Sequence, residues 1–298
     1  MKEIVILSGK GGVGKSSLTA AVGHLLAENH KIVLADTDVD APNLDLVLGA
    51  ELESTHGITA SDKAFIDYDL CSSCMECVDV CRFSSIIGED EPVIVSYSCE
   101  GCGACTLVCP LEAISIQPVE NGKLNILNSG SIRVVAGELG IGESSSGRLV
   151  DVVKRRARQE AELTDSDLLL TDGPPGIGCP VIASLKGVDY AILVTEPTPS
   201  ALSDLKRVVE VSRFFKVEAG VVLNRADMHE GSRNAVLSYL KENDLDLLVE
   251  IPYDPLLPKA LAQGGLAVTM YPEAPASVAI RELSKTMDVM LAGKSKIR

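Results

Sequence analysis

Short apolar runs alternate along the chain with segments of helical periodicity. The first run, residues 2–7, precedes residues 18–29, where leucine and valine recur at helical spacing. A second apolar run, residues 31–35, ends in an acidic segment. Buried strands that alternate with helices favour a parallel sheet covered on both faces. We therefore predict an α/β fold with a mostly parallel, doubly wound sheet.

The same alternation returns in the second half of the chain. Gly137 to Gly147 is polar and glycine-rich, and it predicts a flexible loop or a contact surface. Ser277 is the expected cap of a final amphipathic helix, which we predict closes the core and does not bind a membrane. The expected strands are residues 123–127, 132–136, 167–171, 188–195, 219–223 and 247–251, and the expected helices are residues 148–163, 200–215 and 277–291.

A glycine-rich loop lies between the first strand and the first helix. Residues 8–17 read SGKGGVGKSS and contain the pattern GxxxxGKS, which is typical of a phosphate-binding loop in this strand–helix context. The glycines let backbone N–H groups approach an anion. We predict that Lys15 binds the β- and γ-phosphates and that the Ser16 hydroxyl holds Mg²⁺. The nucleotide-binding residues assigned here are Gly9, Lys10, Gly11, Gly12, Val13, Gly14, Lys15, Ser16 and Ser17.

Two acidic residues follow predicted strands. Asp38 comes after the strand 31–35, and Asp172 directly follows the run 167–171. The carboxyl ends of parallel strands gather the functional groups of open α/β sheets. We predict that Asp38 orients a water molecule or binds Mg²⁺ through water, and that Asp172 faces Mg²⁺. The alternative is that the acids of this segment, Asp36, Asp38 and Asp40, cap the next helix.

Eight of the nine cysteines fall between Cys71 and Cys109, in two runs with the spacing CxxCxxCxxxC. This spacing is typical of bacterial two-cluster ferredoxins, in which the fourth cysteine of each run binds the other cluster. Zinc is the competing interpretation, although zinc sites use pairs of ligands. Arg82 follows Cys81 and adds a positive charge that is expected to raise the potential of the second cluster. The two predicted [4Fe–4S] ligand sets are Cys71, Cys74, Cys77 and Cys109, and then Cys99, Cys102, Cys105 and Cys81.

These cysteines define an inserted domain. We predict a two-cluster ferredoxin domain at residues 58–119, inserted into an ATPase domain made of residues 1–57 and 120–298. The ninth cysteine, Cys179, lies outside the insert, and we expect a small buried core residue there. The alternative is a thiol at a dimer interface.

Composition narrows the class of protein. The net charge is −15 and the pI is about 4.7, so general nucleic-acid binding is not expected. Aromatic residues make up 3% of the chain, which predicts an aliphatic core. We expect neither a signal peptide nor a membrane span, and hence a cytoplasmic protein whose nine cysteines serve metal or redox chemistry.

Lys10 is a second lysine in the loop, and with it the motif KGGVGKS resembles the deviant Walker A ATPases, including MinD, ParA, Mrp and the nitrogenase iron protein. The resemblance implies a MinD-like P-loop NTPase that forms a homodimer on binding ATP, with Lys10 reaching the partner's nucleotide. The alternative for Lys10 is a solvated loop charge. The resemblance also implies that Asp38, in DTDVDAPNLD, positions the attacking water and that DGPPGIG, from Asp172, is a second switch.

The resemblance also implies a base-binding region. Asn224 would read adenine, with Arg225 and Pro252 beside the base. However, the segment NRAD also resembles a guanine-binding motif in which Asp227 would accept from the base, so GTP stays open beside ATP.

These features together predict a Mg²⁺-dependent ATPase that couples nucleotide turnover to iron–sulfur redox chemistry or to metallocluster assembly. Its expected partner is a redox protein or a cluster-accepting protein. The alternative is a ParA/MinD-type positioning or partner-recruiting ATPase whose clusters are structural or sense redox state. A third possibility is a ferredoxin with an inactive ATPase.

Overall fold

A nine-stranded sheet forms the centre of the larger body of the protein in the computed structural model, which describes residues 1–143 and 147–292. Strand β6 is antiparallel to both of its neighbours, β7 and β3, whereas the other neighbouring strands run parallel. The order β11-β10-β9-β1-β8-β2-β7-β6-β3 joins β1 (Lys2–Ser8), β2 (Ile32–Asp36), β3 (Glu51–Ile66), β6 (Ile114–Ser129), β7 (Ile132–Leu139), β8 (Leu168–Pro175), β9 (Tyr190–Thr195), β10 (Glu218–Asn224) and β11 (Asp246–Ile251).

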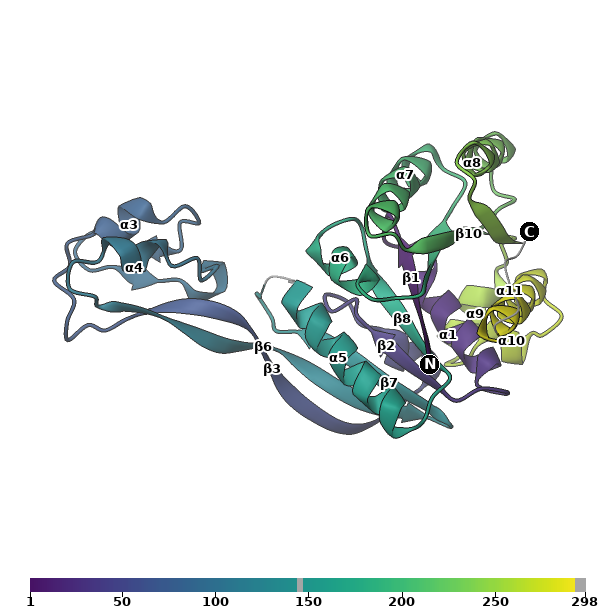
Figure 1. Ribbon diagram of the computed structural model, residues 1–298, viewed down its shortest axis with the longest axis horizontal. Coiled ribbons are helices and arrows are strands. Elements are labelled where there is room, and N and C mark those ends of the chain that lie inside the picture. Colours follow the sequence, from purple (N-terminus) through teal and green to yellow (C-terminus); the bar gives the residue numbers. More distant parts are fainter. Residues whose placement is uncertain (144–146, 293–298) are drawn as a thin grey trace.

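Helices cover both faces of this sheet (Figure 1). Ile4 and Ile6 of β1 pack in one apolar cluster with α1 and α11, whereas Val5 and Leu7 pack in another with α6 and α7. This alternation confirms the doubly wound, mostly parallel sheet that the sequence predicts. The helices of the body are α1 (Lys15–Leu26), α2 (Leu44–Leu48), α5 (Gly147–Leu163), α6 (Cys179–Leu185), α7 (Pro199–Phe214), α8 (Glu230–Glu242), α9 (Leu256–Ala262), α10 (Ala267–Met270) and α11 (Pro275–Leu291).

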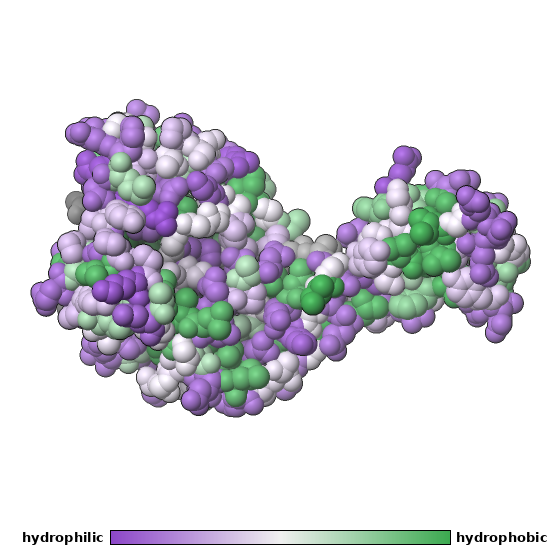
Figure 2. Space-filling view, turned by 180° about the vertical axis from the view of Figure 1, so that it is seen from behind, coloured by the Kyte–Doolittle hydropathy of each residue, from purple (hydrophilic) through white to green (hydrophobic). Residues whose placement is uncertain are grey.

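A long two-stranded arm leaves the edge of the sheet. Strands β3 and β6 contain 16 residues each and stay paired from Glu51 opposite Asn128 to Ile66 opposite Ile114. Their far ends carry a small lobe that is separate from the body (Figures 1 and 2). The lobe contains α3 (Glu76–Val80), β4 (Ile86–Ile87), β5 (Val93–Ile94), the 3₁₀ helix η1 (Ser96–Ser98) and α4 (Ala104–Val108).

The lobe has its own small core, which includes Cys77, Ile86, Cys105 and Ile114. Figure 2 shows apolar side chains gathered on the visible face of the lobe. The sequence-predicted borders of the insert, residues 58 and 119, lie inside β3 and β6. These strands therefore belong to the sheet at one end and to the lobe at the other.

Several element boundaries differ from the sequence expectations. Strand β8 continues to Pro175, so Asp172 lies within it. Helix α11 begins at Pro275, and Ser277 is buried in its first turn and does not cap it. The predicted loop 137–147 is shorter because β7 extends to Leu139, and its residues 144–146 lie outside the described residues.

Gly137 shows why the loop expectation was wrong at its first residue. A Cβ there would lie 2.5 Å from Val153 Cγ2 of α5 and 2.8 Å from Val39 Cγ1. The glycine therefore permits close packing of β7, and it does not mark a turn. Among the described residues, no helix has the length and apolar character needed to cross a membrane.

Candidate functional site

The loop between β1 and α1 has the backbone shape that its glycines allow. Gly12 and Gly14 have φ values of 81° and 91°, in the left-handed region that favours glycine. A Cβ on Gly9 would lie 2.5 Å from Asp204 Cβ, and one on Gly14 would lie 2.6 Å from Asn224 Nδ2. Side chains at either position would therefore push α7 or the end of β10 away from the loop.

Lys15, Asp38 and Asp172 converge below this loop. Lys15 Nζ lies 3.0 Å from Asp172 Oδ1 and 3.6 Å from Asp38 Oδ2. The Thr19 hydroxyl also donates to Asp172 Oδ1, at 3.0 Å. Asp172 Oδ2 is buried and has no hydrogen-bond partner among the described residues. A buried carboxylate oxygen without a partner costs free energy, and a hydrated cation would satisfy it.

Ser16 lies next to this cluster, with its Oγ 3.5 Å from Lys15 Nζ. Burial raises the pKa of Asp38, and the nearby Lys15 opposes that shift. The structure thus brings the four predicted residues Lys15, Ser16, Asp38 and Asp172 to one place. Together they offer one cation, one hydroxyl and two carboxylates beside a loop suited to phosphate.

Asp36 is a further acidic residue of this region, and the sequence interpretation considered it only as one of the acids that could cap the next helix. Its Oδ2 accepts from the backbone N–H groups of Asn43 and Leu44, and its Oδ1 accepts from Asp38 N–H. Asp36 therefore holds the start of α2, whose N-cap residue is Asn43, and so takes the capping role that was the alternative for these acids. Burial, together with the charge of Asp172, raises the pKa of Asp36 to about 7. Its position as the last residue of a buried strand was the available signal.

Lys10 forms an ion pair within the same chain. Its Nζ lies 3.0 Å from Glu196 Oε1, and Arg225 Nη1 lies 2.9 Å from Glu196 Oε2. Lys10 therefore has an ion-pair partner in its own chain, and its side chain remains 39% exposed. Glu196 follows strand β9 and carried no motif, so the sequence did not identify it.

A pocket beside the loop gathers the predicted base-binding residues. It is lined by Gly14, Ser17, Asn224, Arg225 and Pro252, together with apolar side chains of α9, α10 and α11. Asn224 Nδ2 donates to Val13 O at 2.7 Å, which fixes the end of β10 against the loop.

Asp227, the residue of the guanine alternative, does not line that pocket. Its Oδ1 accepts from Tyr253 N–H at 2.6 Å, and it lines a separate pocket with Glu230 and Arg233. The carboxylate therefore holds the turn after β11.

The eight cysteines of the lobe line two pockets, four in each. The two pockets are similar in size. Their cysteines are those of the two sets assigned from the sequence, Cys71, Cys74, Cys77 and Cys109 in one, and Cys81, Cys99, Cys102 and Cys105 in the other.

The lobe repeats itself after 28 positions. Helix α3 begins at Glu76 and α4 at Ala104, each with one cysteine of its set inside the helix. Positive φ values recur at equivalent positions, at Ser73, Met75 and Ser84 in the first half and at Gly101, Gly103 and Glu112 in the second. The backbone therefore builds the same cavity twice.

Backbone N–H groups also donate to cysteine sulfurs. Ser85 N–H donates to Cys81 Sγ at 3.3 Å, and the equivalent Ala113 N–H donates to Cys109 Sγ at 3.2 Å. Such contacts stabilise thiolates. Within the described residues, no three His, Cys, Asp or Glu side chains converge closely enough to bind a single metal ion. The sulfurs instead surround cavities, which is the arrangement that a polynuclear group with one thiolate per iron requires.

The expectation that Cys179 is a buried core residue is wrong. Cys179 is exposed at the start of α6. Helix α6 begins at this residue, and its buried positions are Val181, Ala183, Ser184 and Leu185. Cys179 is therefore a surface residue, close in sequence to the segment that follows Asp172, while Val181 of the same turn is buried.

Comparisons with known proteins agree with this geometry. A family model described as the CobQ/CobB/MinD/ParA nucleotide binding domain matches residues 4–267. An uncharacterized protein of Methanocaldococcus jannaschii is 36% identical over 260 residues, which is 87% of each chain. An uncharacterized ATP-binding protein of the same organism is 24% identical and covers 94% of this chain and 85% of its own.

The fold is also similar to solved structures. The septum site-determining protein MinD of Pyrococcus horikoshii, complexed with Mg-ADP, has a TM-score of 0.62 and 23% identity, and the match covers 99% of each chain. At this identity the likeness shows the fold, a MinD-like P-loop architecture. From the family match and the 36% identical relative, we conclude that this chain belongs to the CobQ/CobB/MinD/ParA family of nucleotide-binding domains.

Proposed function

We propose that this protein is a Mg²⁺-dependent ATPase that switches between a monomer and a nucleotide-bound homodimer. The observation that carries the proposal is the convergence of Lys15, Asp38 and Asp172 beneath a glycine loop, with one Asp172 oxygen left without a partner. The ATP-binding relative and the Mg-ADP complex of MinD, which has the same fold, support it.

Each side chain has a distinct task in this proposal. When nucleotide binds, the Lys15 ammonium group leaves its ion pair with Asp172 and binds the phosphates, because a phosphate offers it a charge-assisted hydrogen bond. Ser16 and Asp172 would hold Mg²⁺, and the ion would supply polarisation of the phosphate oxygens when bound. Asp38 orients the attacking water, and its partly buried position beside Lys15 keeps that water near the phosphate.

Lys10 has a different task in the dimer. Glu196 holds Lys10 in the structure, and a facing nucleotide would compete for the same ammonium group. We propose that ATP-dependent closure moves Lys10 from Glu196 to the phosphates of the partner. The base is bound by Asn224, Arg225 and Pro252. We choose adenine because the Asp227 carboxylate accepts a hydrogen bond from Tyr253 N–H and does not line the pocket of these residues.

The lobe fits two [4Fe–4S] clusters, since each cavity is lined by four thiols and has N–H donors at its sulfurs. One set is Cys71, Cys74, Cys77 and Cys109, and the other is Cys81, Cys99, Cys102 and Cys105. When bound, such clusters supply one-electron transfer. The protein's contribution is to fix eight cysteine side chains in two sets at the end of the arm.

Two roles are compatible with these parts. In the first, the ATPase cycle is coupled to iron–sulfur redox chemistry or to metallocluster assembly with a protein partner, and the two cavities support it. In the second, the protein positions or recruits a partner, and the clusters are structural or sense redox state. The fold shared with a septum site-determining protein supports the second role.

ATP turnover of protein purified without oxygen distinguishes them. Two clusters require about eight iron atoms and eight sulfides per chain. A turnover rate that changes when the lobe is reduced supports coupling, whereas a rate indifferent to reduction but raised by a partner or surface supports positioning. The Lys15→Ala variant provides the background rate in both redox states.

A further inference from the structure

The two cysteine pockets lie at different places along the arm. The pocket of Cys81, Cys99, Cys102 and Cys105 is also lined by Ala64 and Ile116, whereas the other pocket is lined by Ile66 and Ile114. Because β3 runs outward from the sheet, residue 64 precedes residue 66 on the way to the lobe. We call these the proximal and the distal pocket.

One hydrogen bond distinguishes the proximal pocket. Ala64 N–H donates to Cys99 Sγ at 3.4 Å. In the 28-residue repeat, Pro92 is the equivalent of Ala64. The strand pairing agrees with this, because the pair Ile66–Ile114 recurs as the pair Ile94–Ile86. Proline has no N–H group to donate. Hydrogen bonds to sulfur favour the reduced, more negative state, so the proximal site should have the higher potential.

Asp62 and Lys63, which directly precede Ala64, hold the arm to the body. Arg148 Nη1 of α5 lies 2.6 Å from Asp62 Oδ2, and the buried Lys63 Nζ lies 3.0 Å from Glu143 Oε2. Asp62 also contacts the proximal cysteine loop, because a Cβ on Gly101 would lie 2.2 Å from Asp62 O. Residues 62–64 therefore touch the body on one side and the proximal pocket on the other.

Helix α5 continues this connection to the nucleotide site. A Cβ on Gly147 would lie 3.1 Å from Cys179 O at the start of α6. The buried Lys154 Nζ donates to Ser184 O at 2.7 Å and to Lys186 O at 2.8 Å, at the end of α6. Helix α6 follows the segment 173–178, which begins directly after Asp172. The first two turns of α5 are thus joined to both ends of α6.

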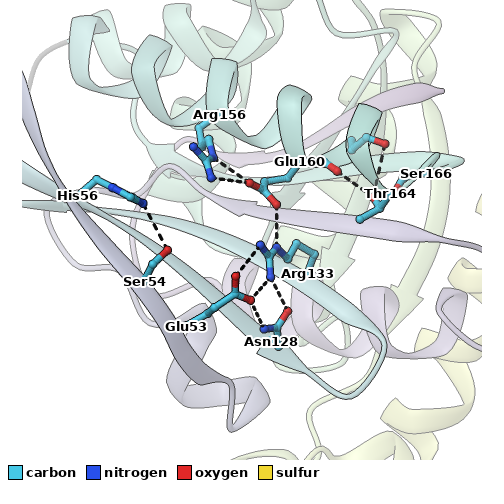
Figure 3. Close-up of polar contacts among 10 residues, drawn as sticks. Glu53, Ser54, His56, Asn128, Arg133, Arg156, Glu160, Thr164 and Ser166 are labelled. Carbon is cyan, nitrogen blue, oxygen red and sulfur yellow. Dashed lines mark hydrogen bonds and ion pairs between the residues drawn. The ribbon is translucent and has the colours of Figure 1, made fainter.

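The other end of α5 is fixed to the root of the arm. Arg133 of β7 binds Glu160 of α5 at 2.8 Å and also pairs with Glu53 of β3 (Figure 3). Arg156 holds the same Glu160 at 2.7 Å. A shift of α6 would therefore move the Gly147 end of α5 about an anchored Glu160 end, and residues 62–64 would follow it.

We propose that residues 62–64 couple the nucleotide state of the body to the reduction potential of the proximal cysteine site, and leave the distal site largely unaffected. This inference rests on the proposed function, because it requires nucleotide in the body and clusters in the lobe. The electron enters from a one-electron donor, and a single electron reduces a single cluster without making or breaking a covalent bond.

Linkage makes the coupling reciprocal. If nucleotide changes the proximal ratio of oxidised to reduced sites about tenfold, reduction changes nucleotide affinity by the same factor. For a one-electron couple a tenfold change corresponds to a shift of about 59 mV.

The test is a potentiometric titration of the anaerobic full-length protein, followed by electron paramagnetic resonance. It is carried out without nucleotide and with Mg²⁺ and a non-hydrolysable ATP analogue. Pro92→Ala assigns the signals, because it supplies an N–H at the distal site and should raise only that potential. At a fixed potential, we expect nucleotide to change the ratio of oxidised to reduced proximal sites about tenfold. The same ratio at the distal site should change less than twofold.

Variants of one ion pair test the route. Arg148→Gln should remove at least half of the shift while ATP binding and both clusters remain, because Arg148 is 63% exposed and lies outside the nucleotide pocket. The exchanged pair Asp62→Arg with Arg148→Asp should restore it. The matched control is Arg155→Gln, which removes one charge from an exposed position on the same helix.

The outcomes separate the two proposals. Absence of iron from folded protein contradicts the cluster assignment of the proposed function. Clusters that are present but show no nucleotide-dependent shift, or an equal shift at both sites, overturn the coupling. A full shift in Arg148→Gln overturns the route through residues 62–64.

Discussion

Lys15 and Asp172 form a buried ion pair across 157 positions of the sequence, with 3.0 Å between Nζ and Oδ1. The pair keeps two charged groups neutralised in the absence of nucleotide, while Asp172 Oδ2 remains without a partner. In the function that we propose, a Mg²⁺-nucleotide complex would supply a new partner to each, phosphate for Lys15 and a hydrated cation for Asp172. Binding would then replace an existing contact and would not fill a solvated site.

Lys15→Ala should abolish nucleotide binding, because the phosphates lose their main cationic partner. It should also lower the free energy of unfolding by about 3 kcal/mol, since Asp172 is left buried and unpaired. Calorimetric titration with ATP and urea unfolding measure the two effects. Adding Asp172→Asn should restore stability without restoring binding. Tight ATP binding by Lys15→Ala would refute the phosphate assignment.

Lys10→Ala should bind ATP with near-normal affinity but hydrolyse it at least tenfold more slowly, because the proposed contact acts across the dimer. Light scattering with Mg²⁺-ATP and steady-state turnover provide the readouts. Glu196→Gln is the matched control, since it frees Lys10 without removing it and should preserve dimerisation. Normal turnover by a monomeric Lys10→Ala protein would remove the cross-dimer role.

Asp227→Asn should leave ATP affinity within about threefold, because an asparagine oxygen can still accept from Tyr253 N–H. Competition of ATP and GTP for a fluorescent nucleotide measures the preference before and after the change. If the native protein prefers GTP and the variant loses that preference, Asp227 contacts the base and the choice of adenine is wrong.

The stability of the metal-free and nucleotide-free protein should carry a pH dependence from Asp36. Its pKa is raised from 3.8 to about 7, chiefly by burial, so the native state binds more protons than the unfolded state between these values. The contribution of Asp36 to stability therefore falls as pH rises from about 4 to 7.

The difference between native protein and Asp36→Asn in urea midpoint, measured across this range, isolates the effect. We expect the difference to favour the variant increasingly toward pH 7, with the asparagine oxygen still capping α2. A difference that does not change with pH would show that Asp36 is ionised throughout.

The central strands were predictable from sequence because they are apolar runs with buried faces on both sides, whereas the largely exposed β3 was not predicted. The loop 9–17 was equally clear, since its glycines and Lys15 stand in a fixed order between a strand and a helix. The two cysteine sets were assigned from spacing alone, and in the structure the same two sets of four cysteines line two pockets.

Other features depend on contacts between distant segments. Glu196 lies beside Lys10 only because β9 and β1 are neighbours, and no local pattern marks it. Gly137 was interpreted as a loop residue, although it lies in β7 to admit the side chain of Val153. The arm itself was hidden because β3 and β6 continue from the sheet into the lobe without a break in pattern.

The central claim is that one chain contains a nucleotide switch and eight thiolates that hold iron–sulfur clusters. Native mass spectrometry of protein purified without oxygen, with Mg²⁺ and ATP added, tests both parts in one measurement. We predict a dimer whose mass contains two nucleotides and two [4Fe–4S] clusters per chain. A folded protein that carries zinc or no metal at these cysteines, or that binds no nucleotide, would contradict this account.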